Sequence, residues 1–205
     1  MSQTIRSFIA FELPAAVTSL LNNVQQELKK SRLAARWVRP QNIHLTLKFL
    51  GNINPVDIEK IGRVMTAAAG DSAPINLTVG GIGFFPGIKR PRVIWVGLGG
   101  QTVALRNFQR NLANRLATIG FPSDKRSFKA HLTIGRFRQA VNPNILSQAV
   151  QDYSDLGNLK FSVERIILFQ SDLKPTGAVY SHLKLVELFG MTNDGRLKCR
   201  MPNEE

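Results

Sequence analysis

The stretch NIHLTLKFLG, Asn42 to Gly51, is matched later in the chain by KAHLTIGRF, Lys129 to Phe137. Both contain the pattern His-x-Thr-x with an apolar residue at each x. The two motif histidines, His44 and His131, are two of only three histidines in the 205 residues. A repeat of this kind indicates that the chain contains two related halves, each with one copy of the motif.

The patterns around the two motifs follow the same order of strands and helices. In the first half, period-2 and period-3.6 patterns predict three strands and two helices, at 4–13, 14–31 (helix), 43–51, 55–69 (helix) and 74–85. In the second half they predict the same set, at 92–100, 103–119 (helix), 130–137, 143–153 (helix) and 160–171. A last strand, at 179–190, has no counterpart. The order predicts an α+β fold in which a β-α-β-α-β unit is duplicated into two similar lobes.

We therefore expect residues 1–190 to form a single bilobal domain and residues 191–205 a polar, disordered tail. The N-terminal residues contain neither a signal-peptide pattern nor a membrane helix. The one cysteine, Cys199, lies in the tail and cannot form an internal disulfide. These features favour a monomer in a reducing, cytoplasmic setting with no membrane partner.

Each motif presents an imidazole beside a hydroxyl, because alternate residues of a strand face the same side. His44 and Thr46 share one face, as do His131 and Thr133, while the aliphatic residues between them face the core. Histidine titrates near neutral pH, so a facing pair can act as acid and base on a phosphodiester. Threonine hydroxyls can donate to the phosphoryl oxygens. The alternative is that both are core histidines whose ring nitrogens are hydrogen-bonded to neighbours. The repetition of the motif makes this alternative less favoured.

The pattern does not favour a metal site or a covalent mechanism. Catalytic zinc takes three protein ligands, and no third residue stands in a matching position. The remaining histidine, His182, has Lys184 where a threonine would stand, so we expect an ordinary, partly buried histidine. Cys199 is excluded as a nucleophile by its place in the tail. No cofactor or metal is therefore expected.

The charge points to a polyanionic partner. The chain has 27 Lys and Arg against 14 Asp and Glu, a formal net charge of +13. Such a surplus attracts nucleic acid, although a merely basic surface would show the same composition.

Four stretches, in the right order and spacing, resemble one known family. These are IRSFIAFELP (5–14), RWVRPQNIHLTLKFLG (36–51), FKAHLTIGRF (128–137) and SDLKPTGAVYSHL (171–183). They resemble the bacterial and archaeal RNA 2′,3′-cyclic phosphodiesterases, also called 2′-5′ RNA ligases, of the two-histidine phosphoesterase superfamily. The resemblance extends over about residues 5 to 189.

The resemblance implies two antiparallel sheets around a central cleft, with one motif from each lobe. It implies metal-independent hydrolysis of an RNA-terminal 2′,3′-cyclic phosphate to a 2′-phosphomonoester, on ends such as those of tRNA fragments. His44 would protonate the leaving 3′ oxygen, His131 would activate water, and Thr46 and Thr133 would hold the phosphate. The reverse reaction is 2′-5′ ligation, and the motifs do not separate the two directions.

Further residues are candidates for binding the substrate. The resemblance includes Arg136, which strict alternation turns away from His131, so its use requires the strand to end or bulge near Gly135. Phe11 is a candidate for stacking on a base, or else a core residue. Three cations could follow the RNA backbone or simply be solvated: Arg36, Arg39 and Lys48.

Two other functions remain open from the sequence. The chain could act on another cyclic phosphate, such as that of ADP-ribose or a small nucleotide, and a substrate panel would decide. It could also be a non-catalytic RNA-binding module, but such a module predicts a degraded motif, and both motifs are intact.

Overall fold

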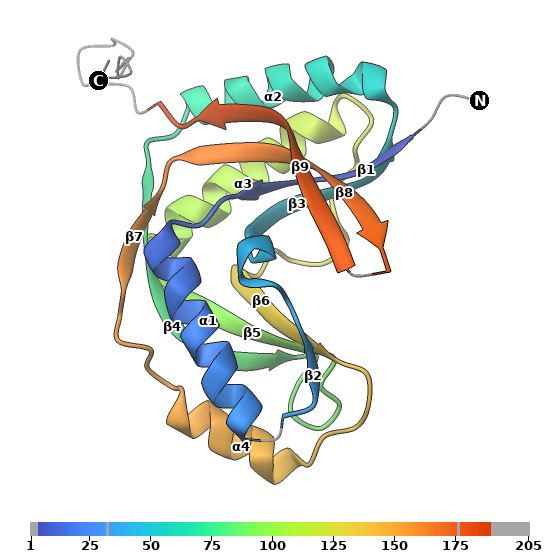
Figure 1. Ribbon diagram of the computed structural model, residues 1–205. Coiled ribbons are helices and arrows are strands. Elements are labelled where there is room, and N and C mark those ends of the chain that lie inside the picture. Colours follow the sequence, from blue (N-terminus) through green and yellow to red (C-terminus); the bar gives the residue numbers. More distant parts are fainter. Residues whose placement is uncertain (1–3, 32, 176, 190–205) are drawn as a thin grey trace, which may run out of the picture.

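Two antiparallel sheets bring the two motifs into one structure, a computed structural model that describes residues 4–31, 33–175 and 177–189 (Figure 1). Within these residues one sheet has the strand order β3-β1-β8-β9 and the other β2-β6-β5-β4-β7. The strands are β1 Ile5–Phe11, β2 Ala35–Trp37, β3 Leu45–Ile53, β4 Ile75–Phe85, β5 Val93–Gly100, β6 His131–Phe137, β7 Lys160–Val163, β8 Arg165–Lys174 and β9 Gly177–Glu187. The α+β fold class is confirmed.

The helices also follow the predicted order. They are α1 Ala15–Lys30, α2 Ile58–Gly70, α3 Thr102–Ala117 and α4 Pro143–Asp152, with short 3-10 turns η1 Pro40–Asn42 and η2 Pro55–Asp57. An Asn-Pro pair begins the helical segment at equivalent places of the two halves. The side chains of Asn54 and Asn142 accept the N–H groups of Val56 and Asn144, and proline occupies the next position in each case.

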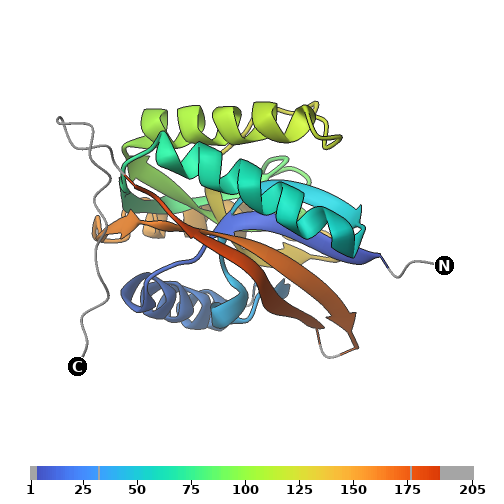
Figure 2. The same cartoon turned by 90° about the horizontal axis from the view of Figure 1, so that it is seen from above.

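The helices pack against both sheets. Figures 1 and 2 show α2 and α3 side by side, where α2 contacts β8 and β9 of the four-stranded sheet, and α3 contacts β3 of that sheet and β4 of the other. Helix α4 contacts β4 of the five-stranded sheet, and α1 is hydrogen-bonded to the carbonyl of Ile134 in β6. One continuous apolar core runs through both halves, from Ile9 of β1 to Leu188 after β9.

The duplication is present, but the two lobes exchange their third strands. The first unit contains β1, β3 and β4, and the second contains β5, β6 and β8. Strand β4 pairs with β5 of the second unit, whereas β8 pairs with β1 of the first. Each sheet is therefore completed by a strand from the other half of the chain.

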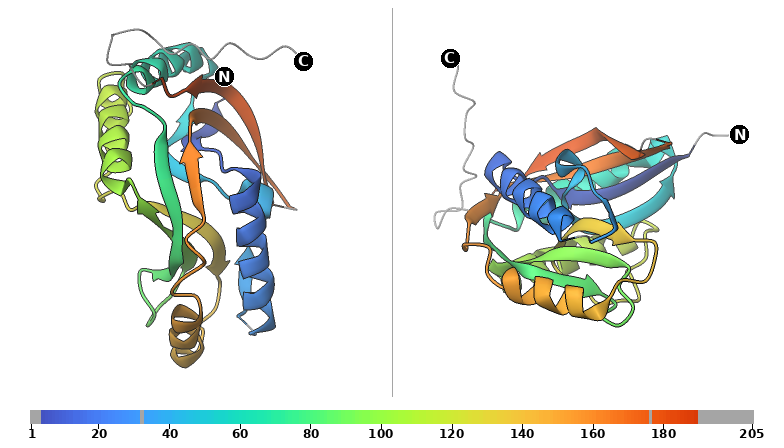
Figure 3. Two further views of the ribbon diagram at one scale, coloured as in Figure 1. Left: turned by 90° about the vertical axis from the view of Figure 1, so that its left-hand side faces the viewer. Right: turned by 60° about the horizontal axis from the view of Figure 1, so that its bottom comes forward.

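Two details of the predicted elements are wrong. The single strand expected at 160–171 is divided at Glu164, because β7 pairs with β4 in one sheet and β8 pairs with β1 in the other. The left view of Figure 3 shows the chain rising from α4 through β7 into the second sheet. Strand β2, a short edge strand against β6, has no strong pattern in the sequence and was not expected.

The predicted tail, residues 191–205, and Cys199 lie outside the described residues. Among the described helices, none combines the length and apolar character needed to cross a membrane.

Candidate active site

The two motif histidines are held in the same way. Nδ1 of His44 lies 2.8 Å from the carbonyl oxygen of Asn42, and Nδ1 of His131 lies 2.6 Å from that of Lys129. A carbonyl oxygen can only accept, so each Nδ1 is the protonated, donating nitrogen. Nε2 is therefore the atom that can take or give a proton on both rings.

His44 lies among aromatic rings that exclude water. Its ring stacks on Phe8, with 4.5 Å between ring centroids, and meets Tyr180 edge-on at 5.4 Å. Burial lowers the pKa of His44 from 6.5 to about 4. The hydrogen bond to the Asn42 carbonyl has the opposite effect and raises this pKa. The positive charge of Arg136 and the nearby His131 lower the pKa further. His44 is therefore neutral at pH 7 when the site is empty.

His131 has a similar but more open surrounding. Phe85 and Trp95 both meet its ring edge-on, at centroid distances of 5.0 and 6.4 Å. Burial lowers the pKa of His131 below 6.5, the carbonyl of Lys129 opposes this change, and Arg136 adds to it. Both imidazoles thus favour the neutral state before an anion binds.

A bulge in β6 turns Arg136 toward the motif face. Ile94 of β5 pairs with Gly135 and the next residue, Trp95, pairs with Thr133, so Ile134 is an extra residue in the ladder. Ile134 and Gly135 are consequently both buried, and Arg136 is exposed on the other side. Since the charge of Arg136 acts on both motif histidines, its guanidinium lies near the place where they meet. The bulge that the sequence required near Gly135 is confirmed.

Gln25 of α1 is hydrogen-bonded to this bulge. Its side chain is 1% exposed, and Nε2 donates to the carbonyl oxygens of Ile134 at 2.7 Å and Val38 at 2.8 Å. The Ile134 carbonyl also accepts the N–H of Val38. This one amide therefore joins α1, the bulge in β6 and the segment after β2.

Replacing Gln25 by alanine is expected to lower the free energy of unfolding by about 1 to 3 kcal/mol, because it removes two hydrogen bonds and leaves the part-buried carbonyl of Val38 without its donor, although the carbonyl of Ile134 keeps the N–H of Val38. The measurement is urea unfolding followed by circular dichroism. Gln26→Ala is the matched control, since this neighbouring side chain is exposed and its hydrogen bonds, to Asn22 and from Lys29, lie on the surface of α1. Equal effects of the two substitutions would contradict the role given to Gln25.

The structure brings the two motifs to one cavity of about 1330 Å³. Thr46 of the first motif and His131 of the second both line it, and β3 contacts β6 across the sheets. Thr133 is half-buried and pairs with Trp95, on the same face of β6 as His131. His44, Thr133 and Arg136 are not among the residues that line it, but Arg136 and His131 lie close enough for their charges to act on His44.

Two of the expected substrate residues are buried: Phe11 lies in the core, and Lys48 lines the cavity but is held by the protein. Phe11 is fully buried, with its ring 5.5 Å from that of Phe108 in α3, so the prediction that it stacks on a base is wrong. Lys48 is only 4% exposed, because a second bulge, at Leu47 in β3, turns it away from the face of Thr46. Its ammonium donates to the carbonyl of Pro122 at 2.7 Å and pairs with Asp124 at 3.1 Å, so it anchors that loop.

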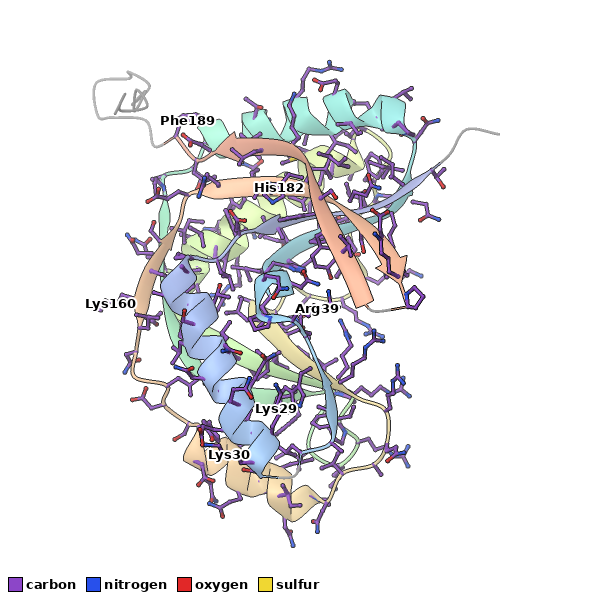
Figure 4. The ribbon with its side chains drawn as sticks, in the orientation of Figure 1. Lys29, Lys30, Arg39, Lys160, His182 and Phe189 are labelled. Carbon is purple, nitrogen blue, oxygen red and sulfur yellow. The ribbon has the colours of Figure 1, made fainter. Side chains whose placement is uncertain are left out.

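The other two cations remain candidates at the edge of the site. Arg36 is exposed on β2 and lies directly opposite Arg136 in the strand register. Cross-strand partners face the same side, so Arg36 faces the same side as Arg136. Figure 4 shows Arg39 at the turn into η1, between the two sheets.

His182 does not contact His44 directly, but both rings meet Phe169, at centroid distances of 5.0 Å for His182 and 6.1 Å for His44. It is more exposed than expected, and its Nε2 is 3.8 Å from a carboxylate oxygen of Glu12 (Figure 4). Within residues 4–31, 33–175 and 177–189, no three His, Cys, Asp or Glu side chains come together as a metal site.

Three residues beside the site were not predicted from the sequence. Asn42 accepts from His44 through its carbonyl, and its side chain donates to the carbonyl of Ala178 in β9 at 2.8 Å. Phe8, rather than Phe11, is the residue of β1 that contacts His44. Phe49 is 59% exposed and stands five residues after its motif histidine, as Arg136 does after His131. Alignment of the two repeats would have identified Phe49.

Paired imidazoles beside hydroxyl and guanidinium donors define an acid–base phosphoesterase site. The comparison with protein families agrees, because the model described as LigT like Phosphoesterase matches residues 11–95 and 98–180. The chain belongs to this family. Each matched segment contains one of the two motifs.

Curated relatives and solved structures confirm the resemblance seen in the sequence. Proteins named RNA 2′,3′-cyclic phosphodiesterase include one from Thermotoga maritima, 31% identical over 179 residues, which are 87% of this chain and 93% of the relative. Another, from Archaeoglobus fulgidus, is 30% identical over 185 residues, 89% of this chain and 100% of the relative. The crystal structure of TT0787 of Thermus thermophilus has a TM-score of 0.75 and 26% identity, and the match covers 89% of this chain and 97% of that one.

Proposed function

We propose that the protein hydrolyses the 2′,3′-cyclic phosphate at the end of an RNA strand to a 2′-phosphomonoester, with no metal ion. The observation that supports this most directly is the equivalent pair of imidazoles. Both have Nδ1 bound to a backbone carbonyl, which leaves Nε2 to exchange protons in one cleft. The curated relatives are named RNA 2′,3′-cyclic phosphodiesterase, which supports the substrate and the hydrolysis.

In the proposed mechanism, His131 acts as the base and His44 as the acid. Nε2 of His131 takes a proton from water as the water oxygen bonds to phosphorus. The bond from phosphorus to the 3′ oxygen breaks, and protonated Nε2 of His44 gives its proton to that oxygen. The acid and base roles follow the family resemblance, and because the pKa of His44 is about 4 in the empty site, its role as the acid requires the bound phosphate to raise that pKa.

The phosphoryl oxygens gain negative charge in this step, and three side chains are placed to stabilise them. Thr46 and Thr133 can donate through their hydroxyl groups, and Arg136 through its guanidinium. Bound phosphate also offsets the positive charge of Arg136, which allows His44 to become protonated in the complex. Ligation is the same sequence reversed, with an RNA 5′-hydroxyl in the position of water.

The test is an assay on an RNA oligomer that ends in a 2′,3′-cyclic phosphate, with and without EDTA. Turnover should be the same in both, because no third metal ligand accompanies the two histidines in the described residues. The product should gain the mass of one water and carry a phosphate at the 2′ position that a phosphatase removes. Loss of turnover in EDTA, with recovery on adding zinc or manganese, would contradict the acid–base mechanism.

The same assay separates the alternatives. A cyclic phosphate of ADP-ribose and small cyclic nucleotides should be poorer substrates than the RNA end. A non-catalytic RNA-binding module would turn over none of them. We also propose a cytoplasmic location, which is expected from the cysteine content, and a monomeric state.

A further inference from the structure

The cavity at the motifs continues well beyond the reacting groups. From Thr46 and His131 it extends along α3, the β4–β5 loop and the loop before β6. Six cations from these three elements line it: Arg90, Arg92, Arg110, Lys125, Arg126 and Lys129. We call this region, together with Phe49, the basic groove.

The charges of the basic groove are not balanced by the protein. Asp124 is the one carboxylate among the lining residues, and it pairs with Lys48. None of the six groove cations forms an ion pair with a carboxylate in the described part of the chain. Like charges gathered in a cleft repel one another and concentrate the field, so the groove attracts a polyanion.

The shape and the apolar part of the groove indicate an extended ligand. A volume of about 1330 Å³ exceeds the roughly 300 to 1,000 Å³ of a usual small-molecule pocket. Phe49 is 59% exposed, although a large apolar side chain is usually covered. Exposed aromatic rings among cations are typical of grooves that bind single-stranded nucleic acid, where bases stack on the rings.

The groove is also tied to the first motif strand. Lys48 lies two residues after Thr46 and holds Pro122 and Asp124 at the beginning of the loop that supplies three of the cations. One wall of the groove therefore has a fixed place relative to both motifs.

We propose that the basic groove binds the RNA nucleotides upstream of the cyclic end, so that the enzyme selects RNA chains over cyclic mononucleotides. This inference rests on the proposed function. It assigns phosphate contacts to the groove cations and base stacking to Phe49. The cyclic phosphate lies at the motifs, and the strand leaves the site along α3.

The test compares kcat/KM for a 2′,3′-cyclic mononucleotide with that for oligomers of increasing length with the same end. Wild-type kcat/KM should rise with length. In Arg110→Ala and Arg126→Ala, the ratio of oligomer to mononucleotide should fall about tenfold each, the worth of one charged hydrogen bond. The plot of log KM for the oligomer against log salt should become shallower by about 0.7 for each phosphate that the variant no longer binds.

Lys160→Ala is the matched control, an exposed cation on β7 far from the groove (Figure 4). It should leave the ratio and the salt dependence unchanged. A wild-type kcat/KM that does not depend on length would overturn the proposal, and so would a Lys160 variant that behaves like the arginine variants.

Failure of the proposed function would give a different result, namely no turnover of either substrate. Fluorescence anisotropy with a labelled oligomer that ends in a 2′-phosphate then tests the groove separately. Arg110→Ala and Arg126→Ala should still weaken this binding, whereas Lys160→Ala should not. Equal affinity of all these proteins would reject the groove whatever the catalytic result.

Discussion

Replacing either His44 or His131 by alanine is expected to lower kcat by at least about a hundredfold, the usual contribution of a positioned acid or base. Both rings have Nδ1 bonded to a backbone carbonyl, and the charge of His131 acts on His44, so we expect each loss to remove one half of a single proton relay. The double variant should therefore lose much less than the product of the two single effects. Single-turnover rates on an RNA oligomer with a cyclic end measure all three variants.

The third histidine supplies the control for this experiment. His182→Ala removes an exposed ring that contacts Phe169 and lies near Glu12, and Phe169 alone separates it from His44. Its turnover should match that of the wild type when circular dichroism shows that it folds. A loss at His182 as deep as at the motif positions, or near-normal turnover in either motif variant, would refute the assignment.

The second large effect is on pH dependence. The reaction requires one proton on the pair of imidazoles, but the free pKa of His44 is about 4 and that of His131 lies below 6.5. Above both pKa values, the singly protonated fraction falls about tenfold for each pH unit. Since kcat/KM reports the free enzyme, it should peak below pH 6.5 and decline about a hundredfold over the two units above it.

The pH profile of kcat should differ from that of kcat/KM in one direction. Bound phosphate stabilises the imidazolium and offsets Arg136, so the decline of kcat should begin at a higher pH. Arg136→Ala should move the decline of kcat/KM to higher pH as well, because Arg136 lowers both histidine pKa values. A kcat/KM that is flat or rising above pH 6.5 would show that this proton is not required.

The sequence predicted the site more completely than the details of the sheets. Two copies of one motif were enough to place His44 and His131 together, because a duplicated unit repeats its geometry. The hydrophobic pattern of the sequence did not predict which sheet β4 and β8 each join. Both strands read as buried, and burial does not tell which neighbour a strand pairs with.

The errors at single residues have a common physical cause, the parity of a strand. In β1, the ring at Phe8 faces His44, whereas Phe11, an odd number of positions away, faces α3. In β3, the extra residue at Leu47 reverses the parity and exchanges the expected places of Lys48 and Phe49. The corresponding bulge in β6 was predicted only because the family resemblance includes Arg136, which can face the motif side only if the strand bulges. A bulge has no reliable signature in one sequence, so strict alternation fails beyond it.

The exchange of third strands makes the two repeats inseparable. A chain ending after β4 would leave β1 without β8 and would expose β4 without its partners β5 and β7. Neither half could cover its own sheet, so the boundary between the two repeats is not a boundary between folding units. A half-length ancestor with this architecture would have required a second copy to supply the missing strand, as a reciprocal, strand-swapped dimer with two identical histidines facing each other.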